Sequence, residues 1–159
     1  MVPGTPSTSD TGSVELGLKF QSDVPGSLTG IRFYKGSGNT GTHIGNLWTS
    51  TGTKLATVTF TGETASGWQQ ATFSSPVTIS ANTPYIVSYY APNGGYAADQ
   101  GFFSTAGTDN PPLHALSNAA GGNGVFVYDT GGGFPTNTYS SSNYWVDVVF
   151  TPAGTWSIS

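Results

Sequence analysis

Apolar and polar residues alternate along most of this chain, and turn-forming residues interrupt the alternation roughly every ten residues. The clearest example is residues 14–20, in which apolar side chains are separated by Glu15, Gly17 and Lys19. Side chains of a β-strand point alternately to its two faces, so this pattern predicts strands with one buried face. No stretch shows a capped repeat of about 3.6 residues, so we expect almost no helix.

Strands of the same kind are expected along the rest of the chain. They are residues 28–35, 43–49, 54–61, 67–74, 76–80, 83–91, 124–129 and 143–151. Many short strands joined by Gly- and Pro-rich turns are typical of sandwiches and barrels. We therefore predict an all-β fold, an antiparallel β-sandwich of jelly-roll-like type, with a core that contains Phe20, Phe33, Phe60, Phe73 and Phe150.

The length of 159 residues fits one domain. Residues 1–12 lack the basic start and the apolar segment of a signal peptide and are rich in Pro, Ser and Thr, so we expect a flexible linker there. Residues 153–159 have the character of a second linker. The expected organisation is a single module over residues 13–152, taken from a longer exported protein whose signal peptide lies upstream.

Composition excludes several classes of protein. Charged residues make up 8% and aromatic residues 13% of the chain, which is the reverse of a disordered composition. Four Lys and Arg residues and a net charge of -4 argue against a nucleic-acid partner. No apolar run approaches the roughly 20 residues of a membrane span. Without cysteine, the chain has no disulfide, thiol nucleophile or Cys-bound zinc.

The connection over residues 92–123 is unusually long and is rich in Gly, Asn and Pro. Loops longer than about 12–15 residues inside a compact domain are usually functional or disordered. The aromatic residues of this segment argue against disorder, so we expect a structured loop region across one end or one face of the sandwich. Residues 130–142 form a second loop of similar character.

Aromatic residues in these loops are the candidate ligand-binding residues. Sugar rings have apolar C–H faces and polar edges, and proteins bind them by aromatic stacking with Asn, Gln, Asp or His hydrogen bonds. Core or loop packing is the alternative role for each aromatic residue taken singly. The candidates are Tyr96, Asp99, Phe103, His114 and Tyr139, with Trp48 and Trp68 as a rival platform.

Carboxylates on the first and last strands give a candidate metal site. In jelly-roll sandwiches these strands are commonly neighbours, so Glu15 and Asp147 are expected to converge near Arg32. A structural Ca²⁺ ion is one interpretation, although calcium requires six to eight oxygen ligands. A salt bridge from Arg32 is the other interpretation. Asp99 or Asp109, with Asn110, is a comparable calcium alternative in the long loop.

The sequence favours a protein that is not an enzyme. Glycoside hydrolysis requires two carboxylates across a cleft, and no two acids form a recognisable pair at short spacing. No Gly-x-Ser-x-Gly elbow is present. The two histidines, His43 and His114, are not spaced as zinc ligands.

Several segments together resemble one bacterial family, domain of unknown function 4082. They are DTGSVELGLKF (10–20), GIRFYKG (30–36), NTGTH (39–43), GETASGWQ (62–69) and NYWVDVVF (143–150). The resemblance covers about residues 9–152. It implies a secreted, all-β accessory module that stands beside immunoglobulin-like repeats, carbohydrate-active enzymes or adhesive regions. It carries over no functional residues.

The sequence and the resemblance lead to one preferred function. We expect a non-catalytic carbohydrate-binding module that tethers a larger extracellular or cell-surface protein to a polysaccharide or other glycan, with neighbouring domains of the same chain as further partners. No cofactor is required beyond the possible calcium ion. The alternative is a structural or adhesive spacer without a small ligand. A binder should place at least two aromatic side chains beside a polar groove, whereas a spacer should bury them.

Overall fold

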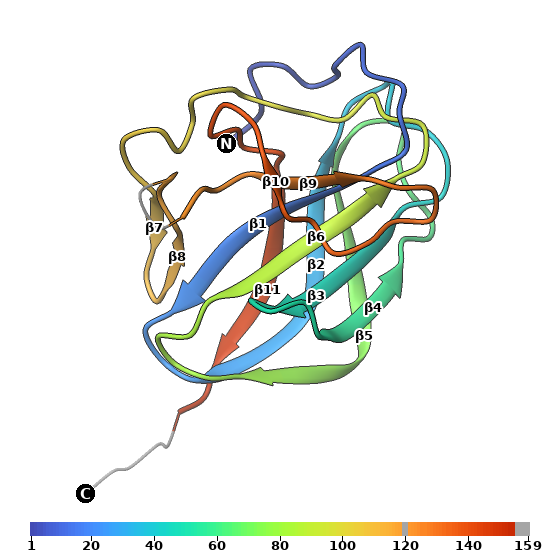
Figure 1. Cartoon of the computed structure of the whole chain (residues 1–159). Coiled ribbons are helices and arrows are strands. Elements are labelled where there is room, and N and C mark those ends of the chain that lie inside the picture. Colours follow the sequence, from blue (N-terminus) through green and yellow to red (C-terminus); the bar gives the residue numbers. More distant parts are fainter. Residues whose placement is uncertain (119–120, 155–159) are drawn as a thin grey trace, which may run out of the picture.

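The computed structural model describes residues 1–118 and 121–154 and confirms the predicted fold. Two antiparallel sheets pack face to face as a β-sandwich (Figure 1). The chain passes repeatedly from one sheet to the other, as expected for a jelly-roll-like arrangement. Among the described residues, no helix has the length and apolarity needed to span a membrane.

The larger sheet, here sheet A, has the strand order β10-β9-β1-β6-β3-β4, and a short hairpin extends it where β8 pairs with β1. Its strands are β1 (Val14–Ser22), β3 (Ile44–Thr49), β4 (Lys54–Thr59), β6 (Tyr85–Ala91), β7 (Thr108–Asn110), β8 (Leu113–Ala115), β9 (Val125–Tyr128) and β10 (Asn137–Thr138). The smaller sheet, sheet B, has the order β11-β2-β5. Its strands are β2 (Gly26–Lys35), β5 (Gly67–Ile79) and β11 (Val146–Pro152).

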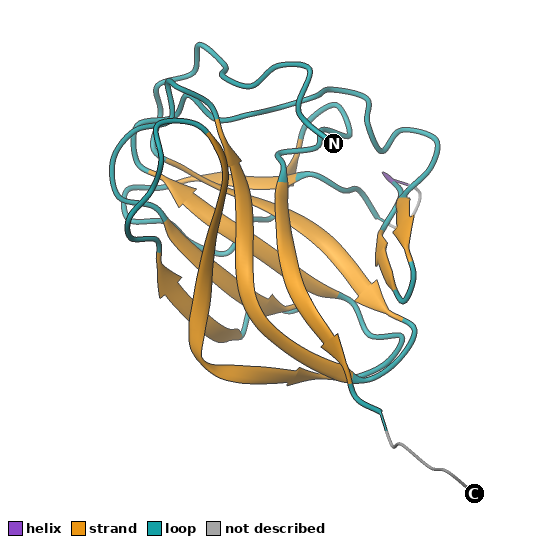
Figure 2. Ribbon diagram, turned by 180° about the vertical axis from the view of Figure 1, so that it is seen from behind, coloured by secondary structure: helices purple, strands orange, loops and turns teal. Residues whose placement is uncertain are grey.

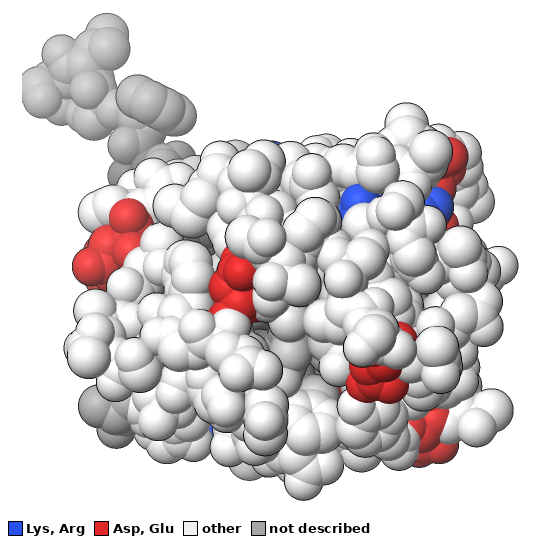
Figure 3. Space-filling model, turned by 90° about the horizontal axis from the view of Figure 1, so that it is seen from above, with Lys and Arg blue, Asp and Glu red and all other residues white. Residues whose placement is uncertain are grey.

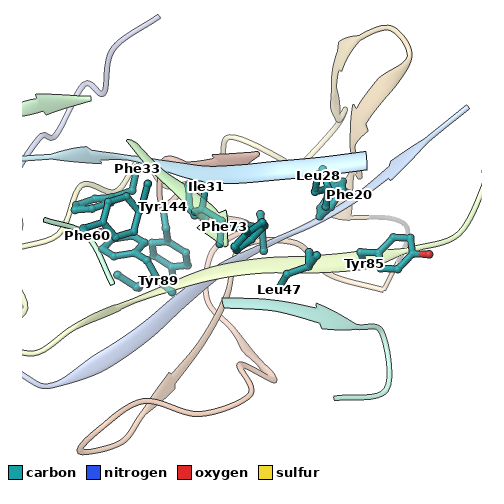
Figure 4. Packing of buried hydrophobic residues seen from close by; sticks show 14 of the residues in the cluster. Phe20, Leu28, Ile31, Phe33, Leu47, Phe60, Phe73, Tyr85, Tyr89 and Tyr144 are labelled. Atoms are coloured by element: carbon teal, nitrogen blue, oxygen red, sulfur yellow. The ribbon is translucent and has the colours of Figure 1, made fainter. Parts of the chain in front are cut away.

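The core lies between the two sheets and is rich in aromatic rings. Phe33 stacks on Tyr89 with ring centroids 4.3 Å apart, and Phe60 meets Phe33 edge-on at 4.9 Å. Figure 4 shows these rings at one end of the core and Phe20 beside Leu28 at the other. Of the predicted core phenylalanines, Phe20, Phe33, Phe60 and Phe73 are buried, while Phe150 is partly buried against the same cluster.

Most strand ends lie within two residues of those expected from the sequence, and two strands differ more. Residues 67–74 and 76–80 form the single strand β5, because β5 is the outer strand of sheet B and tolerates Pro76. The last strand begins at Val146 rather than at residue 143. Trp145 has a φ of 58°, which is outside the extended conformation and prevents the strand from starting earlier.

The N-terminal segment, expected to be a flexible linker, is hydrogen-bonded to the loop after β6. The amide of Thr8 donates to the Tyr96 carbonyl at 2.9 Å, and the amide of Gly95 donates to the Asp10 carbonyl at 2.7 Å. The Asp10 carboxylate also accepts hydrogen bonds from the hydroxyls of Tyr96 and Tyr128. Composition could not reveal this pairing, since the partners are distant in sequence. Of the predicted second linker, residues 155–159 lie outside the described residues.

The predicted structured loop region of residues 92–123 contains the β7–β8 hairpin. The hairpin joins sheet A through β8, which pairs with the C-terminal half of β1. In Figure 2 the hairpin stands beside β11, which is the edge strand of sheet B closer to the hairpin. This placement leaves an edge strand of one sheet facing a hairpin of the other, and a groove lies between them.

Glycine is required where β9 begins. Gly124 has a φ of +75°, and a Cβ there would overlap the Ser142 carbonyl oxygen. We expect Gly124→Ala to lower the free energy of unfolding by about 3 kcal/mol, combining backbone strain and overlap. Gly131→Ala is the control, because its φ is +95° but no atom lies within 4 Å of the added Cβ. Urea unfolding should show a clearly smaller loss for the control, and equal losses would contradict the account.

Candidate binding groove

A groove of about 580 Å³ runs between β11 and the β7–β8 hairpin. This volume lies within the range of roughly 300–1,000 Å³ typical of ligand sites. Sheet B and the loop before the hairpin supply most of its aromatic and charged side chains, and the hairpin supplies the opposite wall. Its polar and aromatic lining includes Arg32, Trp68, Gln70, Phe102, Phe103, Thr108, Asn110, His114, Asn143, Trp145 and Asp147.

Five aromatic side chains follow one another along sheet B and into the loop, and we call them the aromatic row: Tyr34, Trp68, Trp145, Phe102 and Phe103. Successive ring centroids lie 5.6, 6.4, 5.7 and 5.0 Å apart. Trp145 and Phe103 are buried, whereas Trp68 and Phe102 are partly exposed in the groove. The buried members therefore support two rings that a ligand could reach.

Trp145 is held in place by the segment around Asp99. Its indole Nε1 donates to Asp99 Oδ2 at 2.8 Å, and its backbone amide donates to Asn143 Oδ1 at 2.8 Å. Asp99 and Asn143 also form an isolated β-bridge. The Asp99 carboxylate also accepts hydrogen bonds from the amides of Gly4 and Thr5. Asp99 was predicted to contact ligand, but in the structure it positions Trp145 and the N-terminal segment.

The charged groups on the sheet B wall neutralise one another. The Arg32 guanidinium lies 4.4 Å from the Trp68 ring centroid, and its Nη2 lies 3.9 Å from Asp147 Oδ2. Asp147 Oδ1 accepts a hydrogen bond from the Val148 amide at 2.8 Å. This is the salt-bridge alternative that the sequence left open. No hydrogen bond among the described residues uses the side chains of Gln70, Thr108 or Asn110, which leaves neutral donors and acceptors in the groove.

His114 connects the hairpin wall to the turn between β1 and β2. Its Nδ1 lies 2.6 Å from Asp109 Oδ1, and its Nε2 lies 2.7 Å from Asp23 Oδ2. The hydrogen bond to Asp109 and, as the second cause, the hydrogen bond to Asp23 raise the pKa of His114 above 6.5. Only the protonated ring can donate from both nitrogens, so protonation holds both contacts at once.

The second histidine has the opposite environment. His43 is fully buried, with Nδ1 2.8 Å from Glu63 Oε1 and Nε2 2.7 Å from the Asn39 side chain. Lys35 Nζ pairs with Glu63 at 3.2 Å, which completes a polar cluster between two loops. Burial lowers the pKa of His43 below 6.5, against the opposing effect of Glu63. His43 Nε2 faces the Asn39 amide oxygen, and the Asn39 amide nitrogen donates to the Tyr89 hydroxyl at 3.2 Å.

The two histidines are therefore expected to titrate on opposite sides of their common reference pKa of 6.5. The stabilisation that His114 derives from its carboxylates is full below pH 6.5 and is lost as the pH rises through its higher folded-state pKa. Titration followed by NMR of the ring protons should place His114 above His43, and Asp109→Asn should bring the pKa of His114 down. Titration of both rings at one pH would contradict this.

The structure brings some of the predicted site residues together and separates others. Trp68, Phe103, His114 and Asp147 line the groove. Tyr96 is a structural contact of Asp10, and Tyr139 is 59% exposed but lies outside the groove lining. The sequence reasoning did not select Phe102 or Trp145. Tyr144, the neighbour of Trp145, is equally aromatic but belongs to the core, so nothing in the local pattern distinguishes the groove side from the core side.

Trp48 lies on the outer face of sheet A, where the loop after β9 covers it. Its ring packs on Phe134 at 5.4 Å, and its Nε1 donates to Ser88 Oγ at 2.8 Å. The Ser88 hydroxyl in turn donates to Glu15 Oε1 at 2.7 Å, and Asn46 Nδ2 donates to the same oxygen at 2.7 Å. Trp48 is only 6% exposed. The rival platform of Trp48 and Trp68 therefore does not form, because the two rings belong to different sheets.

The proposed convergence of Glu15 and Asp147 is wrong. Glu15 lies on β1 in sheet A and Asp147 on β11 in sheet B, because β1 pairs with β6, β8 and β9 rather than with β11. The alternative calcium ligands in the long loop have other partners: Asp99 accepts hydrogen bonds from backbone amides, and Asp109 binds His114. Within residues 1–118 and 121–154, no three His, Cys, Asp or Glu side chains are grouped as metal ligands.

Glu15 is nevertheless unusual, because it is a fully buried carboxylate. Burial raises its pKa from 4.5 to about 7, and the hydrogen bonds from Asn46 and Ser88 offset only part of that rise. Oε2 has no hydrogen-bond partner among the residues that the structure describes, and Gly132 lies directly above it. The loop over this oxygen is fixed by the Gly131 amide, which donates to the Tyr90 hydroxyl at 3.0 Å. The sequence predicted a structured loop over residues 130–142, but not the burial of Glu15 beneath it.

The surface at the loop end of the molecule carries few charges. Figure 3 shows separate carboxylates on a largely uncharged face, with a few lysine or arginine atoms visible near its edges. This distribution follows from the 8% of charged residues in the chain. Contact with a ligand at this surface must therefore rely mainly on apolar and neutral polar groups.

Comparison with known proteins gives a family and no activity. No curated protein matches the chain. The family model described as "Domain of unknown function (DUF4082)" matches residues 1–146, from the hydrogen-bonded N-terminal segment to the first residue of β11. Since the match covers most of the 159 residues, this chain belongs to the DUF4082 family.

Proposed function

We propose that this protein is a non-catalytic carbohydrate-binding module and that the groove beside β11 is its glycan site. One observation carries the proposal: the partly exposed rings of Trp68 and Phe102 flank a groove that also presents neutral amides and a hydroxyl. The C–H faces of a sugar stack on such rings, while its hydroxyls exchange hydrogen bonds with amides. This arrangement meets the criterion of two aromatic side chains beside a polar groove.

The composition of the groove favours binding without catalysis. Asp147 is the one carboxylate among the described lining residues, and it is paired with Arg32. Glycoside hydrolysis normally uses two carboxyl groups placed on either side of the scissile bond. A single carboxylate cannot supply both of the carboxyl groups that this mechanism uses.

The biological role that follows is attachment. The module would hold a larger extracellular or cell-surface protein on a polysaccharide, with neighbouring domains supplying other activities. The resemblance to secreted accessory modules and the scarcity of charge support this location. No metal ion is required for stacking and neutral hydrogen bonding.

A structural or adhesive spacer is the second candidate, and one observation favours it. Phe103 and Trp145 are 1% and 5% exposed, so these rings of the aromatic row contribute to packing. The two candidates differ in whether Trp68 and Phe102 contact a glycan. A spacer predicts no binding and no effect of removing either ring.

A broad glycan array followed by affinity gel electrophoresis with soluble polysaccharides tests the proposal. We expect at least one polysaccharide to retard the protein, and Phe102→Ala to reduce the retardation. Tyr139→Ala is the matched control, because it removes an exposed aromatic ring outside the groove. Absence of binding across the array, or equal loss in both variants, would contradict the groove as a glycan site.

Binding should also depend weakly on salt. Few charges line the groove, and Arg32 and Asp147 already neutralise each other. We expect the affinity to change less than about twofold between about 0.05 and 0.5 M NaCl, a range in which the Debye length falls severalfold. Isothermal titration calorimetry at both salt concentrations measures this. A tenfold loss of affinity would show that charge pairing dominates.

A further inference from the structure

Three polar side chains lie side by side across the groove face of sheet B, and we call them the polar row: Gln70, Arg32 and Asp147. Arg32 on β2 is the register partner of both Gln70 on β5 and Asp147 on β11. Directly opposed side chains on antiparallel strands have Cβ atoms about 4.5–5.5 Å apart. All three residues line the groove. Arg32 is therefore flanked on both sides by groups that accept hydrogen bonds.

The guanidinium of Arg32 has unused donors. It forms no hydrogen bond with any residue that the structure describes, and its Nη2 lies 3.9 Å from Asp147 Oδ2. That separation is beyond the range of an N–H···O hydrogen bond, which is about 2.7–3.2 Å. Nε is buried without a partner, whereas Nη1 and Nη2 remain accessible in a side chain that is 36% exposed. The two terminal nitrogens thus present free N–H groups to the groove.

Packing holds these donors beside the aromatic row. The Arg32 guanidinium lies 4.4 Å from the Trp68 ring centroid, and Tyr34 and Trp145 meet that ring edge-on. A guanidinium is planar and stacks on aromatic faces, so its N–H groups are oriented before a ligand arrives. A sugar that contacts Trp68 is therefore close to a preformed pair of donors.

The gap between Arg32 and Asp147 fits a hydroxyl group. One oxygen atom can lie within hydrogen-bond distance of both Nη2 and Oδ2, because each bond spans about 2.7–3.0 Å. A hydroxyl accepts from Nη2 and donates to Oδ2 at the same time. A second hydroxyl beside the first can accept from Nη1 and bond to the Gln70 amide, which no hydrogen bond among the described residues uses. The polar row therefore matches two hydroxyl groups held next to each other.

The spacing of these two hydroxyls follows from the rigid fork of the guanidinium. Its terminal N–H groups are fixed side by side and match two oxygen atoms that are themselves held side by side. Free hydroxyls on adjacent carbons of a sugar ring have this arrangement. When the carbon between two hydroxyls carries a glycosidic bond instead, the two oxygens are farther apart and face different groups.

We infer that the polar row binds a pair of free hydroxyls on adjacent carbons of a sugar ring, and that Arg32 makes the groove specific for glycans whose residues carry such a pair. This inference rests on the proposed function and names the ligand class of the same site. It assigns Arg32 a direct contact with the ligand in addition to its contact with Trp68.

Linkage isomers of one sugar test the inference. In a pyranose chain joined through C3, the linkage consumes the hydroxyl between those of C2 and C4, so interior residues keep no adjacent pair. Chains joined through C4 or C6 keep the pair at C2 and C3. The probes are laminarin against pustulan and β-1,3-xylan against β-1,4-xylan, and any other ligand from the array is compared with its own 1,3-linked isomer. We expect the 1,3-linked member to bind at least about tenfold more weakly, because it leaves charged donors unpaired.

Matched variants test the role of Arg32. Arg32→Gln and Lys54→Gln each remove a positive charge that lies over a tryptophan ring, but Lys54 lies over Trp48, outside the groove. We expect Arg32→Gln to weaken binding of the tightest ligand at least about tenfold and to narrow the preference between linkage isomers at least about threefold. Arg32→Lys keeps the charge without the fork and should narrow the preference in the same way. Lys54→Gln should change neither quantity.

Calorimetric titration measures these affinities, and the melting temperature of each variant shows that it is folded. Equal or tighter binding of the 1,3-linked isomers overturns the inference and leaves a carbohydrate-binding function in place. An unchanged isomer preference in folded Arg32→Gln, or equal effects of the Arg32→Gln and Lys54→Gln substitutions, overturns the role of Arg32. Binding to no glycan at all overturns the proposed function and the inference with it.

Discussion

Replacing Glu15 with glutamine is expected to abolish a loss of stability that the native protein undergoes between about pH 4.5 and pH 7. The folded-state pKa of Glu15 is raised, so the folded protein binds the proton more tightly than the unfolded chain does. The contribution of Glu15 to stability is therefore greatest below pH 4.5 and falls until the pH passes the folded-state value of about 7. A shift of this size corresponds to about 3 kcal/mol.

Thermal unfolding over a pH series measures this effect. A loss of about 3 kcal/mol lowers the melting temperature of a domain of this size by roughly 6–12 °C. In Glu15→Gln the side chain stays uncharged, so the melting temperature should vary less between pH 5 and pH 8. Asp129→Asn removes an exposed carboxylate and serves as the control. The control should keep the pH profile of the native protein. If Glu15→Gln keeps that profile too, the burial of Glu15 does not govern how the melting temperature depends on pH.

The effect has a structural readout in the loop above Glu15. Gly132 lies over the unpartnered Oε2, and Phe134 packs on Trp48 in the same covering loop. Lys54, whose Nζ lies 5.0 Å from the Trp48 ring centroid, is the nearby cation that favours the charged carboxylate. Ionisation of Glu15 should therefore increase hydrogen exchange in residues 131–135 before the rest of sheet A.

Replacing Trp68 with alanine is expected to weaken glycan binding by about 30-fold, or roughly 2 kcal/mol. Trp68 is a partly exposed ring on β5, supported from behind by Trp145 and Tyr34. Truncation removes the stacking surface and also releases Arg32, which lies over that ring. Trp68→Phe should retain part of the affinity, because a smaller ring still stacks on a sugar.

Calorimetric titration with the tightest soluble polysaccharide from the array measures the Trp68 effect. Near-ultraviolet circular dichroism and the melting temperature of each variant check that the sandwich is intact. Tyr139→Ala, which removes a ring that is 59% exposed outside the groove, should bind like the native protein. Native affinity in a folded Trp68→Ala protein would mean that the glycan does not stack on this ring.

The sequence predicted the strands well, because a period of two reports directly which side of a strand is buried. Residues 14–20 became β1, and the predicted phenylalanines entered the core. The pattern failed where long-range contacts decide the outcome. Pro76 fits β5 because this strand is at an edge, and Trp145 leaves the extended conformation next to its bond with Asp99. Neither fact is visible in a local window.

The candidate site was predicted only in part for the same reason. Trp68 and His114 were identified by residue type, and they line one groove only because the tertiary fold places the hairpin of sheet A beside sheet B. Glu15 and Asp147 were expected to be neighbours because the first and last strands were expected to pair. Strand pairing is set by the whole topology, so residue alternation could not correct that expectation.

The most direct test of the central claim is a map of amide chemical-shift changes in labelled protein during titration with a soluble, uncharged polysaccharide. The account predicts changes that cluster at Trp68, Asn110, Asn143 and Asp147, on both sides of the groove. Changes centred on Trp48 and Phe134 over sheet A, or no changes with any glycan, would contradict it.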